Sequence, residues 1–195
     1  VREATVAMDM AAAARLVSIS QMRDYTDAHP GWEGVQQVRD ALLLADENSR
    51  SPNETRTRLI WVLDAGFPKP LVNRPVWDLQ GRLLGYADLL DPEAGVVGEY
   101  DGADHRSGRR QSKDVAREDR FRRCGLEYFK VTGPDTPPVI VDRMITTRAR
   151  AKWSAPETRG WTLEPPADWE PEMSLDDWFA WREIIQRPGD DEQSA

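Results

Sequence analysis

Residues 85–105, GYADLLDPEAGVVGEYDGADH, decide the fold because they hold most of two short apolar segments and the turn between them. The apolar segments lie at 83–90 and 95–100, and the turn-forming residues Asp-Pro-Glu-Ala-Gly at 91–95 connect them. Short apolar segments around such a connection are typical of a β-hairpin with a longer loop. We therefore predict two neighbouring antiparallel strands at this point of the chain.

Three carboxylates of this hairpin are expected to converge. Asp88 and Glu99 fall on the neighbouring strands, and the two-residue period of a strand points Asp101 to the same face as Glu99. Carboxylates in one patch repel each other unless a cation neutralises them, and hard oxygen ligands suit Mg²⁺ or Mn²⁺. We predict a metal site formed by these three acids. Gly98 and Gly102 are expected to leave room for a ligand or another backbone.

The alternative is that these acids are ordinary solvent-facing residues of the strands. Asp and Glu are depleted in strands, however, and the adjacent Val96 and Val97 indicate a buried, paired element. The composition around the acids therefore favours a functional patch over a solvated face.

The elements around the hairpin predict a fold of the α/β (α+β) class. Apolar spacing and capping residues indicate a small helical segment at 1–48, with helices at 4–16, 21–28 and 35–45. The domain that follows, at 51–150, is expected to run in the order helix, three strands, helix, strand, helix. These elements are expected at 53–65, 71–78, 82–90, 95–101, 111–124, 126–132 and 139–152.

The most basic stretch of the chain follows the hairpin. Residues 106–123 hold eight Arg or Lys and three acids. A charged helix is often only a solvated face, but like charges crowded beside three carboxylates are more easily explained by a polyanion between them. We predict that nucleic acid contacts this helix. The candidate contacts are Arg106, Arg109, Arg110, Lys113, Arg117 and Arg120.

Two further residues have both a functional and a structural interpretation. His105 is a candidate general acid–base because its unperturbed pKa lies near neutrality, and otherwise it is an exposed loop residue. Glu54, in the first turn of a helix that begins with Ser51-Pro52, favours the helix dipole whether or not it has a catalytic role. Both alternatives stay open at this point.

Composition sets the cellular setting that we expect. The net charge is −8, but the acidic, Trp-rich extension at 153–195 carries the excess of acids, so the rest of the chain is balanced. Its tryptophans either pack back on the domain or bind a protein partner. A single cysteine, no basic-then-apolar leader and no apolar segment of bilayer length predict a cytoplasmic protein without a membrane partner. Because the chain begins at Val1 without methionine, we expect it to be part of a longer protein.

Several short motifs in a fixed order resemble a known family. They are Ser51-Pro52-Asn53-Glu54, Asp88-Leu89, Glu99-Tyr100-Asp101-Gly102 with His105, Asp114-x-x-Arg117, and Gly125 followed by Val131-Thr132. This order is similar to that of endonuclease-like domains related to very-short-patch-repair nucleases, of the PD-(D/E)XK restriction-endonuclease-like superfamily. Such domains often occur in actinobacterial proteins with AbiEi-type antitoxin regulators.

The resemblance covers about residues 51–133 and implies an αβββαβ core that hydrolyses DNA with Mg²⁺ or Mn²⁺. It places Glu54 toward the metal site, with Asp88, Glu99, Asp101 and His105. The superfamily's usual lysine, two residues after the second acid, is here Asp101, as in short-patch-repair relatives that also lack it; Lys130 on the next strand is a candidate substitute. The alternatives are an inactive nuclease-fold module that regulates DNA or acts as an antitoxin, and a structural partner that docks through the Trp-rich extension.

Overall fold

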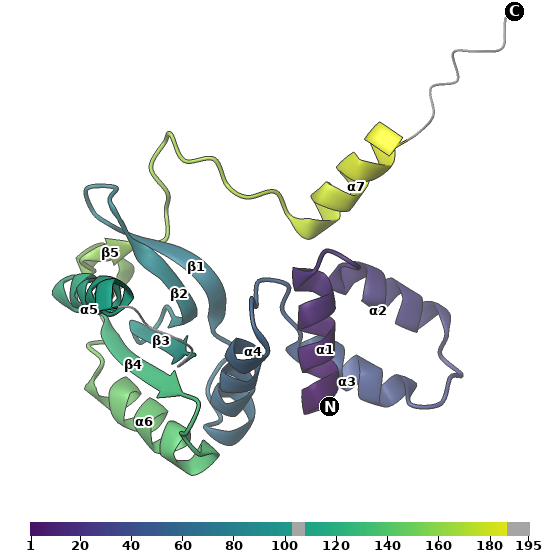
Figure 1. Ribbon diagram of the computed structural model, residues 1–195, viewed down its shortest axis with the longest axis horizontal. Coiled ribbons are helices and arrows are strands. Elements are labelled where there is room, and N and C mark those ends of the chain that lie inside the picture. Colours follow the sequence, from purple (N-terminus) through teal and green to yellow (C-terminus); the bar gives the residue numbers. More distant parts are fainter. Residues whose placement is uncertain (103–107, 187–195) are drawn as a thin grey trace, which may run out of the picture.

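A computed structural model describes residues 1–102 and 108–186, apart from the side chains of residues 108–114 and 186. The chain forms a mixed five-stranded sheet with helices packed on both faces, and three further helices lie beside it at the N-terminal end (Figure 1). None of the helices in this part of the chain is long and apolar enough to cross a membrane.

The predicted hairpin lies in the interior of the sheet. Its strands are β2 (Leu83–Asp91) and β3 (Val96–Asp101), which pair antiparallel, and β1 (Leu71–Asp78) pairs antiparallel with β2. On the other side of β3, β4 (Glu127–Thr132) runs parallel and forms one edge of the sheet. The opposite edge is β5 (Trp161–Thr162), a two-residue strand that the sequence analysis did not predict.

The predicted order of helix, three strands, helix, strand, helix is confirmed. The helices of this core are α4 (Pro52–Leu59), α5 (Gly108–Arg123) and α6 (Pro137–Arg150). Helix α4 continues as one π-helical turn, Ile60–Asp64. Helix α5 connects the two parallel strands β3 and β4, which need a crossover of this length because a tight turn joins only antiparallel strands.

Each face of the sheet has its own apolar core. The π-helical turn and α6 cover one face, where Trp61, Phe129 and Met144 are buried. Helix α5 covers the other face through Phe121, which packs with Leu126 and with residues of β2. The acids at the end of β3 lie on the face of the sheet that α5 covers.

The interpretation of Gly98 as room for a ligand is wrong. The ring of Phe129, on the neighbouring strand, lies directly over this glycine, and a Cβ placed there would be 2.2 Å from the ring. Gly98 therefore serves packing of the α6 face, because no larger residue fits beneath the aromatic ring.

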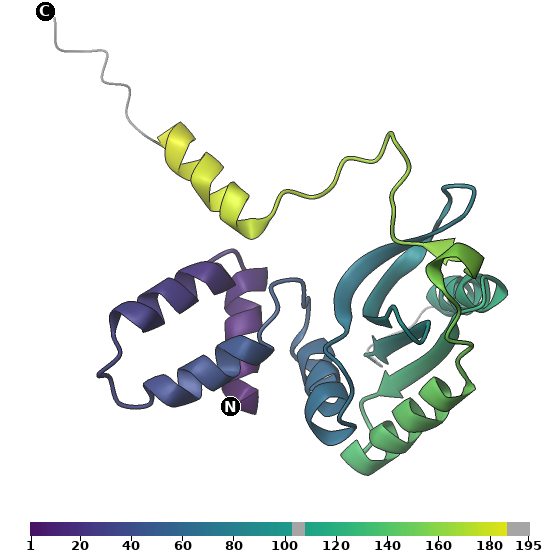
Figure 2. The ribbon, with the colours of Figure 1, turned by 180° about the vertical axis from the view of Figure 1, so that it is seen from behind.

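The predicted helical segment is present. It consists of α1 (Arg2–Ala13), α2 (Ile19–Ala28) and α3 (Val35–Leu44), which pack together and reach the sheet through α4 (Figures 1 and 2). Ser18 caps α2 in a capping box, as an N-terminal serine is expected to do. The first helix ends at Ala13 rather than at residue 16.

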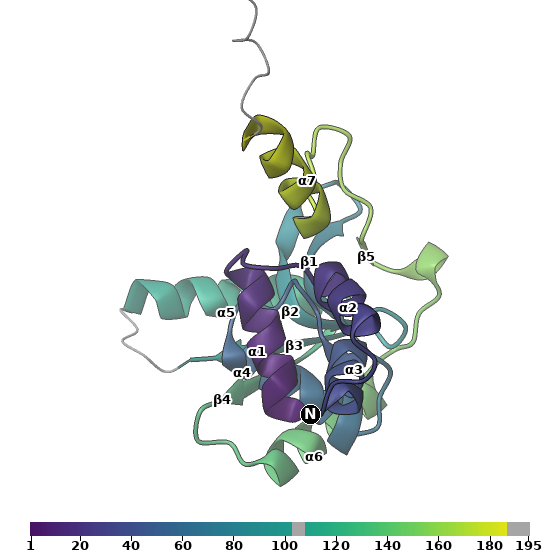
Figure 3. The ribbon, with the colours of Figure 1, turned by 90° about the vertical axis from the view of Figure 1, so that its right-hand side faces the viewer.

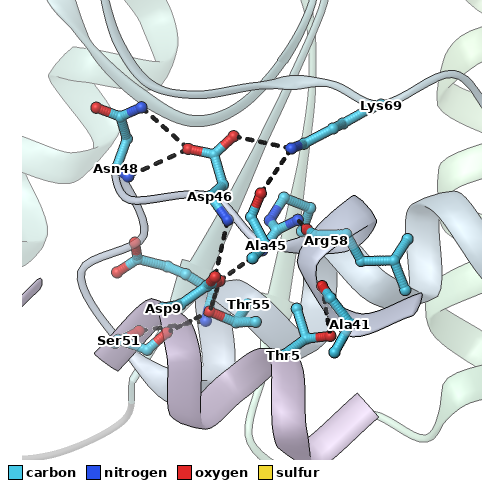
Figure 4. Close-up of polar contacts among 12 residues, drawn as sticks. Thr5, Asp9, Ala41, Ala45, Asp46, Asn48, Ser51, Thr55, Arg58 and Lys69 are labelled. Atoms are coloured by element: carbon cyan, nitrogen blue, oxygen red, sulfur yellow. Dashed lines mark hydrogen bonds and ion pairs between the residues drawn. The ribbon is translucent and has the colours of Figure 1, made fainter. Parts of the chain in front are cut away.

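A buried ion pair joins this helical segment to α4 (Figure 4). Arg58 of α4 pairs with Asp9 of α1, and both side chains are 0% exposed. Asp9 also accepts hydrogen bonds from the hydroxyl of Thr55 (2.7 Å) and from the backbone N–H of Asp46 (2.8 Å). The charge on Asp9 is therefore fully surrounded by donors, and α1 is fixed against the helix that carries Glu54.

The C-terminal extension packs back on the domain. Trp161 is buried in β5, and Trp169 contacts Trp77 of β1 with ring centroids 5.3 Å apart. The last helix, α7 (Leu175–Gln186), lies past the ends of α1 and α2, on the opposite side of the molecule from α6 (Figure 3). Its Leu175 packs against the apolar core of the helical segment. Of the two alternatives for the tryptophans, intramolecular docking therefore holds for Trp161 and Trp169.

Candidate functional site

The acids Asp88 and Glu99 lie side by side on the two interior strands. Leu89 pairs with Gly98, so Asp88 and Glu99 are opposite one another at the next position along the hairpin. The backbone N–H of Tyr100 donates to Asp88 Oδ2 at 2.9 Å and fixes the direction of that carboxylate. The prediction that these two acids lie on neighbouring strands is therefore confirmed.

Glu99 is the buried member of the pair, with 3% of its side chain exposed. Its Oε2 atom accepts a hydrogen bond from the hydroxyl of Tyr128 (2.6 Å) and pairs with the guanidinium of Arg117. Burial and the adjacent Glu99 carboxylate raise the pKa of the Tyr128 phenol well above its ordinary value. Tyr128 is thus kept protonated and donates to Glu99 throughout the neutral pH range.

At neutral pH, Asp88 is close to its own pKa. Burial, followed by the negative charges of Glu54 and Glu99, raises its pKa to about 7, while the Tyr100 N–H and Arg117 oppose the shift. Burial is the largest cause of this shift, and the charges of Glu54 and Glu99 add to it.

Glu54 reaches this group of acids from α4. Ser51 caps the helix by accepting from the Glu54 N–H (3.2 Å), and Glu54 Oε2 accepts from the Arg50 N–H (3.0 Å). The Asn73 side-chain amide also donates to Glu54 Oε2 at 2.8 Å. The structural interpretation of Glu54 is therefore confirmed, because it completes the helix start. Its charge also acts on Asp88, and its catalytic role stays a prediction.

Asp101 and Lys130 form the far side of the site. The Lys130 ammonium lies 3.6 Å from Asp101 Oδ2, and the side chains are 29% and 12% exposed. Lys130 is paired with Glu99 in the β3–β4 register, so it emerges on the same face. Position 101 thus holds an acid where the resembled superfamily has a lysine, and a lysine from the next strand supplies a cation there.

The predicted nucleic-acid contacts divide into two groups. Arg117 is directed to Glu99, and the Arg120 side chain donates to the carbonyl of Leu84 at 2.9 Å. Both belong to α5 and have partners within the chain. The side chains of the other predicted contacts, Arg106, Arg109, Arg110 and Lys113, lie outside the described part of the structure, and so does the predicted acid–base residue His105.

Sequence reasoning missed two residues of the site. Tyr128 lies two positions before Lys130 on one strand, a spacing that places both on one face, and this signal was present in the sequence. Asn73 adopts a left-handed backbone conformation (φ 47°) that directs its amide to Glu54. Nothing in the sequence around Asn73 indicates this geometry.

The donor atoms fit a hard divalent cation in type and charge, but they are not arranged as a completed site. Among the residues that the structure describes, no group of three or more His, Cys, Asp or Glu side chains is placed to hold a metal ion. Glu99 Oε2 already faces Arg117 and Tyr128, whereas Asp88 and Glu54 are the acids whose charges oppose one another. Oxygen-only ligands with excess negative charge are the set that Mg²⁺ and Mn²⁺ prefer.

Comparison of the chain with models of known protein families, with curated proteins and with solved structures gives no significant match. The functional assignment therefore depends on the chain's own residues and their geometry.

The raised pKa of Asp88 predicts that metal-free stability falls as pH rises. A carboxyl with a pKa of 3.8 when unfolded and about 7 when folded keeps its proton longer in the folded state. The free energy of unfolding then declines between about pH 4 and pH 7 and levels off above that interval. We expect Asp88→Asn to be more stable than the wild type by up to about 4 kcal/mol above pH 7, because it removes the buried charge.

Urea unfolding of both proteins over this pH range measures the difference. Below about pH 4 the two free energies should converge, because Asp88 is then protonated in both states. A difference that does not change with pH would show that Asp88 carries no unfavourable charge in the folded protein.

Proposed function

We propose that this chain is a divalent-metal-dependent nuclease that hydrolyses phosphodiester bonds in DNA, built on a restriction-endonuclease-like core. The observation that carries the proposal is that acids of three elements, Glu54 of α4, Asp88 of β2 and Glu99 of β3, lie near enough for the charges of Glu54 and Glu99 to raise the pKa of Asp88. A lysine and an arginine, Lys130 and Arg117, lie beside them. Acids and cations at one sheet end are what phosphodiester chemistry requires.

In this proposal each residue of the candidate site has one role. Asp88 and Glu99 hold the cation, with Glu54 and Asp101 around it; the bound ion supplies an activated water and offsets charge on the phosphate. Lys130 stabilises the negative charge that develops on the phosphate oxygens. His105 carries the proton as general acid–base. The basic residues at 106–113 hold the DNA backbone.

Incubation of the wild-type chain with DNA tests this function. Plasmid, linear duplex and single-stranded DNA are each incubated with Mg²⁺, with Mn²⁺ and with a chelator. We expect cleavage of at least one substrate with metal and none with the chelator. Intact DNA in every reaction would reject the nuclease proposal.

A second candidate function is supported by the contacts of Glu99. Because Arg117 and Tyr128 already occupy Glu99 Oε2, the same fold is suited to a module that binds DNA without cutting it. Such a module would act as a DNA-binding regulator or as an antitoxin-like protein-interaction domain. In that case the wild type binds DNA equally well with and without metal, and cleaves none.

The position of Lys130 gives a further prediction. Lys130→Met keeps the length of the side chain and removes its charge, so DNA cleavage is expected to slow by about 10²-fold, the usual effect of losing one electrostatic donor. The exposed Lys152 provides the control, and Lys152→Met should cleave at the wild-type rate. Equal rates for both variants would remove Lys130 from the site.

A further inference from the structure

A polar cavity of about 430 Å³ lies along the open edge of the sheet, between α5, β4 and α6. Four cationic side chains and two acids line it, together with Tyr128, Phe129 and two threonines. We call it the β4-edge groove. The charged residues of the groove are Arg122, Lys130, Arg143, Arg150, Glu118 and Asp135. The side chains that line the groove therefore carry a net positive charge, which suits an anion. Two acids outside the lining lie close to these cations: Glu127 pairs with Arg122 and Arg150, and Asp101 pairs with Lys130.

Two arginines cover the outward carbonyls of the edge strand. The Arg122 guanidinium donates to the carbonyl of Tyr128 at 3.2 Å, and the Arg143 guanidinium donates to the carbonyl of Lys130. These carbonyls are two residues apart, which is about 6.6 Å along a strand. The two guanidinium groups, one from α5 and one from α6, therefore bind successive outward carbonyls of the same edge strand.

The arginines of the groove are held in place by ion pairs with acids, and Arg122 and Arg150 share Glu127. Asp135 accepts two hydrogen bonds from Arg143 (2.8 and 3.1 Å), which, with the Thr132 N–H, lower its pKa to about 2. Glu118 pairs with Arg122 at 3.0 Å on one side. Arg150 pairs with Glu127 at 3.6 Å and donates to the hydroxyl of Thr147 at 3.5 Å. Side-chain exposures of 44% for Arg122, 35% for Arg143 and 56% for Arg150 leave their remaining donors open to a ligand.

Two residues that line the groove also contact acids of the candidate active site. Tyr128 lines the groove and donates its hydroxyl to Glu99, and Lys130 lines the groove while its ammonium lies against Asp101. A nucleic-acid strand with one phosphate at the acids would therefore have its neighbouring phosphates in the groove. Arginine forks suit phosphate because two N–H groups bind two oxygens at once.

We propose that the β4-edge groove binds the phosphodiester backbone of nucleic acid, next to the scissile bond that would lie at the carboxylates. The position of the scissile bond rests on the proposed nuclease function; the binding of the backbone does not. This assigns α6, through Arg143 and Arg150, to nucleic-acid binding, in addition to the basic residues of α5.

Binding of a labelled DNA duplex to the full chain, measured by fluorescence anisotropy with chelator present, tests the groove separately from cleavage. The variant is Arg122→Gln with Arg150→Gln, which leaves the oriented Arg143 and the proposed catalytic Lys130 unchanged. Each lost phosphate contact reduces the steepness of log affinity against log salt by about 0.9, so the slope of this variant should be less steep by about 1.8. Arg150→Gln alone, at an exposed position, should lose about half of that.

The matched control removes the same charge from the helical segment, by Arg23→Gln with Arg39→Gln, and should keep the wild-type slope. A variant slope equal to that of the wild type, with cleavage retained, would overturn the groove and leave the nuclease proposal standing. A reduced slope in a protein that cuts nothing would support the groove and reject the nuclease. No binding of DNA by the wild type, or displacement of the duplex by polyglutamate as readily as by unlabelled DNA, would overturn the groove as a nucleic-acid site.

Discussion

Asp88→Asn is expected to abolish metal-dependent cleavage of DNA and to leave the chain folded. The asparagine keeps the hydrogen bond from the Tyr100 N–H, because its side-chain oxygen accepts in the same place as Asp88 Oδ2. It removes the charge that, with Glu54 and Glu99, is proposed to attract the cation. Loss of the ion's stabilisation of the transition state, worth several kcal/mol, corresponds to a rate reduction of about 10³-fold or more.

The rate of plasmid cleavage by purified protein measures this effect. Asp142→Asn, on the exposed side of α6, makes the same chemical change away from the site and should cleave at the wild-type rate. Residual cleavage by Asp88→Asn within a few-fold of the wild type would place the chemistry elsewhere in the chain.

Arg58→Met is expected to destabilise the fold by about 3–5 kcal/mol, the usual result of leaving one member of a buried ion pair without its partner. Asp9 is 0% exposed, so its charge would have no access to water after the guanidinium is removed. The hydrogen bonds from Thr55 and from the Asp46 N–H only partly compensate. Urea unfolding gives the free energy of unfolding of each variant.

Arg56→Met is the matched control for this prediction. Arg56 lies two residues earlier on α4 and pairs with Glu3 of α1, but these side chains are 47% and 73% exposed. Exposed pairs contribute about 0–1 kcal/mol, so this variant should unfold within that range of the wild type. Equal losses for Arg56→Met and Arg58→Met would show that burial of the pair does not determine its contribution.

The sequence predicted the core of the fold well because local signals there agree. Period-2 apolar segments with a turn between them located the hairpin, and Ser51-Pro52 located the start of α4. The edge strand β5 was missed because two residues are too few to show a period. The Arg58–Asp9 pair was missed because an acid in an alanine-rich helix gives no sign of burial when its partner lies 49 positions away.

Of the candidate site, the sequence predicted the acids on the strands but not the side chains that contact them. Alternation along β2 and β3 placed Asp88 and Glu99 on one face. The direction of Arg117 toward Glu99, rather than outward, depends on how α5 lies across the sheet, and helical spacing does not encode this crossing. The same limit applies to Phe129, whose ring covers Gly98 from the next strand.

Calorimetric titration of Mn²⁺ into the chain measures whether Asp88 and Glu99 hold a divalent cation, as proposed. The titration is done above the pKa of Asp88, with the wild type and with Glu99→Gln, which keeps the size of the side chain and removes its charge. We predict saturable binding by the wild type and its loss in Glu99→Gln, with an unchanged fold. Equal binding by both proteins, or no binding by the wild type, would contradict the claim.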